Sequence, residues 1–277
     1  MLRTVLIIVV VAIIIAAVGV AYAVFRTPEE ASAPIQAVPL VVETAPAVAV
    51  ATETSQAPAV EATAAPQPTA TPEPEATATT EAVATTEPDP TQKPVAATGP
   101  IVFEIVQDES EARFIIDEVL RGSPKTVVGV TNQVAGQIAV DPADPASAQV
   151  GQISINARTL ATDSDMRNRA VKNRILQTDA YEFVTFQPTQ LMGLPESAAA
   201  GEPLSFQIVG DLTIRDTTKQ VTFDVTLTPV DETRLEGLAT LTIPYRDFGL
   251  AIPDSPSVDT VADNVTLELE FVAVASQ

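Results

Sequence analysis

Four basic side chains lie close together in the sequence and are its best candidates for binding an anion. Arg167, Arg169, Lys172 and Arg174 occur in a chain whose formal net charge is −21. Guanidinium and ammonium groups donate charge-assisted hydrogen bonds to phosphates and carboxylates. Two interpretations stay open: a cationic rim for a phosphate or carboxylate headgroup, formed by Arg167, Arg169 and Arg246, or a solvated charged surface.

Catalytic chemistry has little support in the residue types present. The chain contains no His, Cys or Trp, which excludes Ser-His-Asp and Cys-His catalysis, ordinary zinc sites and disulfides. Asp163 with Asp165, and Asp254 with Asp259, are spaced as carboxylate pairs, but acids in loops commonly serve as caps and turns. We expect no enzyme activity, no metal and no cofactor. The negative charge also argues against binding nucleic acid.

An apolar run of 20 residues, Val5 to Val24, lies between Arg3 and Arg26. This length matches a hydrocarbon core about 30 Å thick. The flanking charges favour a cytoplasmic N-terminus, with the remaining chain outside the cytoplasm. Ala21-Tyr22-Ala23 matches a signal-peptidase site, so a cleaved signal peptide is the alternative. We favour residues 1–26 as an uncleaved single-pass anchor that leaves the C-terminal domain periplasmic or on the cell surface.

Residues 27–99 have the composition of a linker. They are rich in Ala, Pro, Thr, Val and Glu, lack aromatic residues, and contain one basic residue, Lys93. Such a segment buries too little apolar surface to offset an ordering cost of about 1–2 kcal/mol per residue. We predict a disordered, semi-extended spacer between the membrane and the domain.

Residues 100–277 form the predicted domain. Apolar and polar residues alternate along many segments with a period of two, which is typical of antiparallel strands with one buried face. The clearest segments are 110–117, 133–141, 204–214, 219–228, 235–243 and 264–273. With flanking strands near Val102, Ile153 and Phe183, they suffice for an antiparallel β-barrel of about eight strands.

One short helix is expected to interrupt this all-β pattern. Thr162, Asp163 and Ser164 are three successive candidate N-caps. The basic helical turns that follow extend through Ile175, after which Phe183 to Phe186 returns to strand.

The apolar faces of the predicted strands include Gly136, Gly210 and Gly237. Glycine within a strand marks either curvature or close approach of another group. One interpretation is therefore barrel curvature. The other is that the missing side chains leave room in the lumen for an apolar ligand.

Several sequence motifs resemble those of the YceI-like family. The motif T-L-x-T-D is followed by R-N-x-x-x-K-N-x-I-L and D-x-Y between Thr159 and Tyr181. Family-like strings recur in order at 127–129, 136–138, 210–216, 219–223 and 246–250. One departure is Glu182, where the family usually has Pro.

The resemblance implies a lipocalin-like barrel that encloses a long apolar chain, such as a polyisoprenoid, a quinone side chain or a fatty amide. The expected function is non-catalytic storage, transport or sensing of this lipid; the alternative is a structural or adhesive β-domain displayed on a stalk. The oligomeric state is left open. The expected lumen residues are Phe114, Gly136, Ile138, Ile153, Phe206, Gly210, Leu212, Phe223, Gly237 and Leu241.

Overall fold

The structure is a computed structural model that describes residues 26–32, 34–41 and 99–276, with the single residues 13, 15, 19 and 22. Apart from Arg26 and these single residues, the predicted anchor lies outside the described residues, and so does most of the predicted linker. No helix among the described residues is long and apolar enough to cross a membrane. The domain elements are β1 (Ile101–Ile105), η1 (Gln107–Glu109), β2 (Glu111–Leu120), β3 (Ser123–Thr131), β4 (Val134–Ala135), β5 (Gln137–Asp141), β6 (Asp144–Val150), β7 (Ile153–Asn156), η2 (Ala157–Thr159), α2 (Asp165–Ala170), η3 (Val171–Ile175), β8 (Phe183–Met192), β9 (Leu204–Ile214), β10 (Thr217–Asp231), β11 (Arg234–Pro244), η4 (Tyr245–Phe248), β12 (Val258–Val261) and β13 (Asn264–Ala275).

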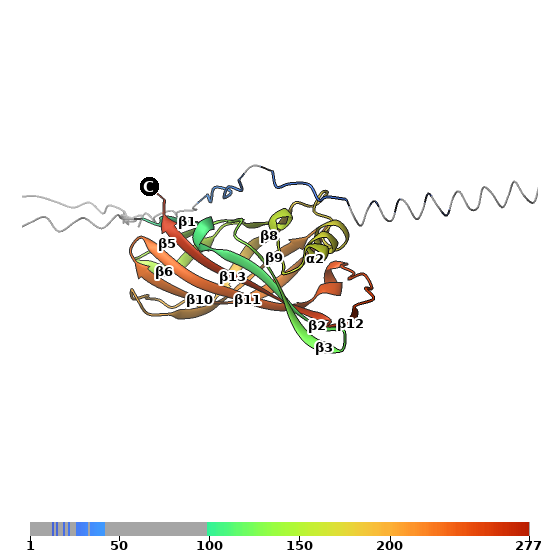
Figure 1. Cartoon of the computed structure of the whole chain (residues 1–277). Helices are drawn as coiled ribbons and strands as arrows, with labels where there is room; N and C mark the ends of the chain where they lie inside the picture. The colour runs from blue at the N-terminus through green and yellow to red at the C-terminus, as the bar shows by residue number, and fades with distance from the viewer. Residues whose placement is uncertain are drawn as a thin grey trace, which may run out of the picture. The chain divides into compact units, whose positions relative to one another are not determined.

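The strands form one curled antiparallel sheet (Figure 1). Its order is β4-β7-β8-β9-β10-β11-β13-β1-β5-β6, and β2 pairs with β3, β12 and β13. Only Gly136 separates β4 from β5, so the sheet order returns close to the stretch of chain where it began. The all-β prediction with one short helix is therefore confirmed.

The predicted number of about eight strands is too low, because the sheet contains 13. Long extended stretches are broken where the backbone leaves regular pairing. The 3₁₀ turn η1 separates β1 from β2, Gly136 separates β4 from β5, and residues 151–152 separate β6 from β7. Alternation of side chains continues across short breaks of this kind, so the sequence pattern did not mark them.

The predicted helix is present as α2, which continues into the π-helical turn η3 and ends at Ile175. Of the three candidate N-caps, Ser164 is the one used: its side chain accepts a hydrogen bond from the Arg167 amide. Thr162 instead contacts Asn168, whose Oδ1 accepts from the Thr162 amide at 2.7 Å. Local side-chain hydrogen bonds thus fix where this helix begins.

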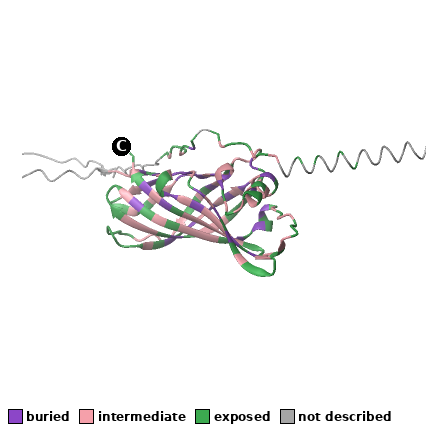
Figure 2. Ribbon diagram, in the orientation of Figure 1, coloured by how far each residue is buried: buried purple, intermediate pink, exposed green. Residues whose placement is uncertain are grey.

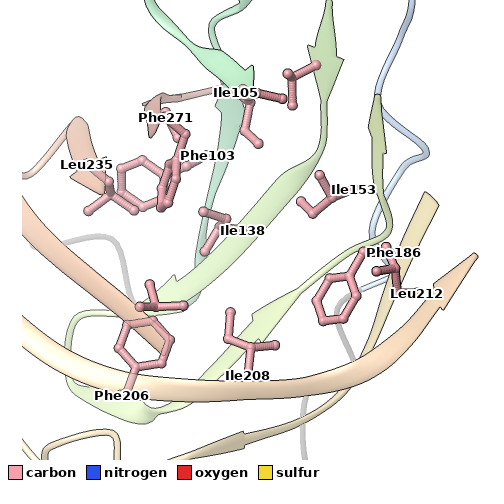
Figure 3. Close-up of a cluster of buried hydrophobic side chains, with 14 of the residues drawn as sticks. Phe103, Ile105, Ile138, Ile153, Phe186, Phe206, Ile208, Leu212, Leu235 and Phe271 are labelled. Atoms are coloured by element: carbon pink, nitrogen blue, oxygen red, sulfur yellow. The ribbon is translucent and has the colours of Figure 1, made fainter. Parts of the chain in front are cut away.

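The apolar faces of the strands meet in the interior of the curled sheet. Buried residues lie on inward-facing positions, while exposed residues dominate the outer positions and loops (Figure 2). Figure 3 shows Phe186, Ile208 and Leu212 in one part of this interior and Phe103, Leu235 and Phe271 in another. The period-two pattern therefore reports the buried face correctly.

The inward-facing glycines are each covered by a neighbouring side chain. A Cβ atom at Gly210 would lie 2.6 Å from the Phe186 ring and 2.5 Å from the Gln187 carbonyl oxygen. A Cβ at Gly237 would lie 2.5 Å from the Phe271 ring, and one at Gly136 would overlap the side chain of Ile153. Protein side chains thus occupy the space directly beside these glycines, which favours the curvature interpretation over the one in which they clear space for a ligand.

Residues 26–32 and 34–41, which fall mostly within the predicted linker, lie against the domain. In Figure 1 this extended blue segment runs from the side of α2 towards β1. The Arg26 carbonyl accepts from Asn173 Nδ2 at 2.9 Å, and the Leu40 amide donates to Gln137 Oε1 at 2.7 Å. Between these points Ile35 is buried. We call residues 26–41 the docked segment.

Arg158 and Glu182 hold the first half of the docked segment. The Arg158 guanidinium donates to the Glu30 carbonyl at 3.2 Å and pairs with the carboxylates of Glu29 and Glu182. Glu182 Oε1 also accepts from the Ser32 amide at 2.8 Å. Burial alone would raise the pKa of Glu182, but the hydrogen bonds and the charge of Arg158 outweigh it and hold this pKa below its usual value.

We predict that Gly210→Ala destabilises the domain by about 1–3 kcal/mol, because the added methyl group must displace Phe186 or the β8 backbone. Urea unfolding of the wild type and variant measures this difference. Gly151→Ala is the matched control, since a Cβ there meets its nearest neighbours at 3.4 and 3.5 Å, an ordinary contact. Equal effects of the two substitutions would contradict the close packing over Gly210.

A second prediction concerns pH. Because the pKa of Glu182 is lowered in the folded state, the stabilisation it provides is present at neutral pH and is lost as pH falls below about 4.5. Hydrogen exchange, corrected for the intrinsic rate, should show loss of protection in residues 26–41 over this range. Glu182→Gln should weaken protection already at neutral pH, whereas Glu202→Gln, in an exposed loop, should not. Unchanged protection in Glu182→Gln would refute the role of this carboxylate.

Candidate functional site

The interior of the curled sheet carries continuous apolar rows across neighbouring strands. In one row Phe206 pairs with Val225, Val225 with Ala239, and Ala239 with Leu269. A parallel row joins Leu241, Leu267 and Phe114 on β11, β13 and β2. Antiparallel pairing places directly opposite residues on the same face, so these rows line one apolar surface.

This apolar surface is not fully buried in its middle. Along β11, Leu235 and Ile243 are buried, whereas Gly237, Ala239 and Leu241 between them are partly exposed. The inward positions Leu267 and Leu269 of β13 are also partly exposed, although Phe271 and Ala273 further along are buried. Along β11 the partly exposed inward positions lie between buried ones, so they do not mark a frayed strand end.

The predicted lumen residues lie in this interior, but in different settings. Ile138, Ile153, Phe206 and Leu212 belong to the main buried cluster, and Phe223 and Leu241 pack against it. Phe114 packs in a second cluster, beside Ile116, Val127 and Tyr245. Gly136, Gly210 and Gly237 lie on the same surface beneath neighbouring side chains. Their role in binding a ligand stays a prediction.

Sequence reasoning missed Ala239, Leu267 and Leu269 as site residues. All three are partly exposed members of the interior rows. The signal that places them there is the alternation that identified β11 and β13. Which inward residues stay accessible depends on how the strands curl, and alternation within a single strand carries no information about that.

The end of the interior near α2 is polar. The inward face of β2 continues from Phe114 and Ile116 to Glu118, which is buried. Arg167 Nη2 lies 2.7 Å from Glu118 Oε1, and its Nη1 pairs with Asp163. Arg167 therefore lies at this end of the interior with its positive charge compensated by two carboxylates. An open hollow of about 540 Å³, lined by Glu118, Lys125, Thr260 and their neighbours, lies beside it.

The other two predicted headgroup residues have different surroundings. Arg169 is exposed on α2. The Arg246 side chain is also largely exposed, with Nε 3.3 Å from Asp263 Oδ1 and the guanidinium over the Tyr245 ring. No interaction between described residues joins Arg246 to Arg167 or Arg169. A shared rim of all three arginines stays a prediction, and Arg167 is the member already engaged by protein carboxylates.

The acidic pairs take part in ordinary structural contacts. A hydrogen bond from Lys125, with the charge of Arg167 nearby, holds the pKa of Asp163 below its usual value. Asp259 accepts from the Gly122 amide at 2.7 Å. Among the described residues, no group of three or more Asp and Glu side chains is arranged to hold a metal ion.

Comparison with solved structures finds several that are similar to this chain, one of them with a TM-score above 0.5. A polyisoprenoid binding domain from Saccharophagus degradans, implicated in plant cell wall breakdown, aligns at 14% identity and a TM-score of 0.51, over 64% of this chain and 99% of that chain. Burkholderia cenocepacia BcnA aligns at 21% identity and a TM-score of 0.49, over 61% and 99%. A Campylobacter jejuni YceI protein aligns at 18% identity and 0.43, over 52% and 82%.

A search of curated proteins gave no match. The family model for the YceI-like domain, however, matches residues 103–273, which is more than half of the chain. The match spans the whole curled sheet from within β1 to within β13, including α2 and the apolar interior. The chain therefore belongs to the family of YceI-like domains.

Proposed function

We propose that this domain binds a long-chain apolar lipid, such as a polyisoprenoid, in the interior of the curled sheet, and does so without catalysis. The observation that carries the proposal is the partly exposed stretch of β11, Gly237 to Leu241, between buried Leu235 and Ile243. Transfer of an apolar chain from water to such a surface gains about 0.8 kcal/mol per methylene group. A long chain therefore gains enough to bind without specific polar contacts.

Two further observations support a lipid over other ligands. The rows around Ala239 contain apolar side chains from several strands, whereas polar groups such as Glu118 and Arg167 lie at the end of the interior near α2. The Saccharophagus degradans domain of the same fold is described as binding a polyisoprenoid. An elongated ligand with one polar end suits this distribution.

We further propose that the domain works outside the cytoplasmic membrane, where the N-terminal apolar run tethers it to a source of lipid. The basis is the sequence of residues 5–24 and the positive charges that flank it. Such a tether suits storage, local transport or sensing of a lipid. Polyisoprenoids, quinones and fatty amides share the required apolar chain.

Filling the interior should block binding. We predict that Ala239→Phe weakens binding of a radiolabelled polyprenol about tenfold or more, because the ring displaces at least two methylene groups, each contributing about 0.8 kcal/mol. Native mass spectrometry of protein from a membrane-containing host should show the corresponding loss of a bound apolar mass.

The matched control is Thr240→Phe, which places the same ring on the opposite face of the same strand. It should leave polyprenol binding unchanged. If neither the wild type nor the control carries or binds an apolar molecule, the domain is instead a structural or adhesive module. If both substitutions weaken binding equally, the interior is not the binding site.

We also propose that the cationic rim expected from the sequence binds a phosphate headgroup, which its two exposed members, Arg169 and Arg246, can test. We expect Arg169→Ala with Arg246→Ala to weaken binding of a polyprenyl phosphate at least tenfold, since a charge-assisted hydrogen bond contributes about 1.5–3 kcal/mol. Binding of the neutral polyprenol should change little. Equal losses for both lipids would mean that these residues act through packing, and no loss for either would mean that they are solvated surface charges.

A further inference from the structure

The docked segment begins close to the end of the predicted membrane anchor. The apolar run ends at Val24, and Arg26 is fixed to the domain through Asn173 Nδ2, at 2.9 Å from its carbonyl oxygen, and through an ion pair with Asp179. Two residues of extended chain span at most about 7 Å. Arg26, which Asn173 of η3 holds to the domain, therefore lies within roughly this distance of the point where the apolar run ends.

This short connection constrains the domain if residues 5–24 span a bilayer. The headgroup layer on each side of the hydrocarbon core is roughly 5–7 Å thick. A span that ends at Val24 would then place Arg26 and η3 in or against this layer. Residues 41 and 99 both belong to the same compact unit as the domain, so the number of residues between them would not set the distance of the domain from the membrane.

The surface beside Asn173 is positively charged, which suits a position against the lipid headgroup layer. Arg169 and Arg174 are exposed and Lys172 is partly exposed. Within the described part of the chain, no ion pair joins these three residues to a carboxylate, whereas nearby Asp163 and Asp179 are paired with Arg167 and Arg26. Met166, with 75% of its surface exposed, lies on the same short helix. The result is a basic surface with an apolar side chain on a strongly acidic protein.

We propose that the α2–η3 end of the domain rests on the membrane surface, with Arg169, Lys172 and Arg174 against anionic lipid headgroups. The proposal rests on the membrane anchor of the proposed function. Basic residues next to a membrane span are attracted to anionic leaflets, while the acidic remainder of the domain is repelled. The docked segment holds this end, rather than another, towards the bilayer.

The test uses the full-length chain in vesicles of phosphatidylcholine and phosphatidylglycerol in a two-to-one ratio. Because the chain has no cysteine, Met166→Cys carries a unique fluorophore. A headgroup-attached quencher lipid should quench this label strongly. Glu232→Cys, in the exposed β10–β11 turn, is the position control and should be quenched little. In Figure 1 this turn lies near the C-terminus, away from α2.

The contribution of the basic residues to docking is tested with the fluorophore at the same position, Met166→Cys. Arg169→Glu with Arg174→Glu should lower the ratio of docked to undocked domain about tenfold or more, since each basic residue near an anionic surface contributes to docking. In vesicles of phosphatidylcholine alone, the wild type should also dock less. Equal quenching in all these samples would overturn the electrostatic docking proposed here.

Alkaline carbonate extraction separates failure of the anchor from failure of the docking. A chain that stays in the vesicles while its Met166→Cys label is no more quenched than the Glu232→Cys label overturns the docking proposal alone. A chain that is extracted overturns the anchor, and the docking proposal with it. Polyprenol binding in the interior is measured independently and is unaffected by either result.

Discussion

The structure depends on close contact between aromatic rings and glycines on the inner face of the curled sheet. Phe186, Phe271 and Phe114 lie over Gly210, Gly237 and Gly129. Each ring occupies space that a side chain on the neighbouring strand would need, so adjacent strands can curl tightly without a steric clash. Tight packing at these points coexists with accessible apolar positions such as Ala239 and Leu267. Curvature and partly exposed apolar positions therefore occur on the same face.

The sequence was sufficient to predict the fold class, the short helix through Ile175 and the inward face of most strands, because alternation and helix caps are local signals. It did not predict what covers the glycines. A missing side chain at Gly210 is visible in the sequence, but the ring of Phe186 over it depends on pairing between strands. The docked segment was missed for a related reason, since its composition is that of a linker and its partners, such as Gln137, are distant in the chain.

Glu182, at the position where the resemblance noted in the sequence led us to expect Pro, has a structural role. A proline at this position would provide no carboxylate for the Ser32 amide, Asn156 Nδ2 or the Arg158 guanidinium. These contacts connect the docked segment to the turn before β8 and to the end of β7. Arg158 satisfies the carbonyl groups of Thr178 and Asp179 as well. A partly buried ion pair of this kind is maintained by its additional hydrogen bonds rather than by attraction between charges alone.

The positions of the docked segment and the apolar interior bear on how a lipid would reach the domain. A long apolar chain in water is unfavourable in proportion to its exposed surface, so transfer over a short distance from the bilayer is favoured over release into solution. Arg26 is attached to η3, and Arg167 of the adjoining α2 closes the polar end of the interior against Glu118. The same end of the domain thus holds Arg26 and contains the polar end of the interior. Exchange of the Arg167 pairing from Glu118 to a lipid phosphate would leave the buried Glu118 carboxylate without this partner, which is strongly unfavourable. Arg167 is therefore better suited to holding the polar end of the interior together than to binding a headgroup.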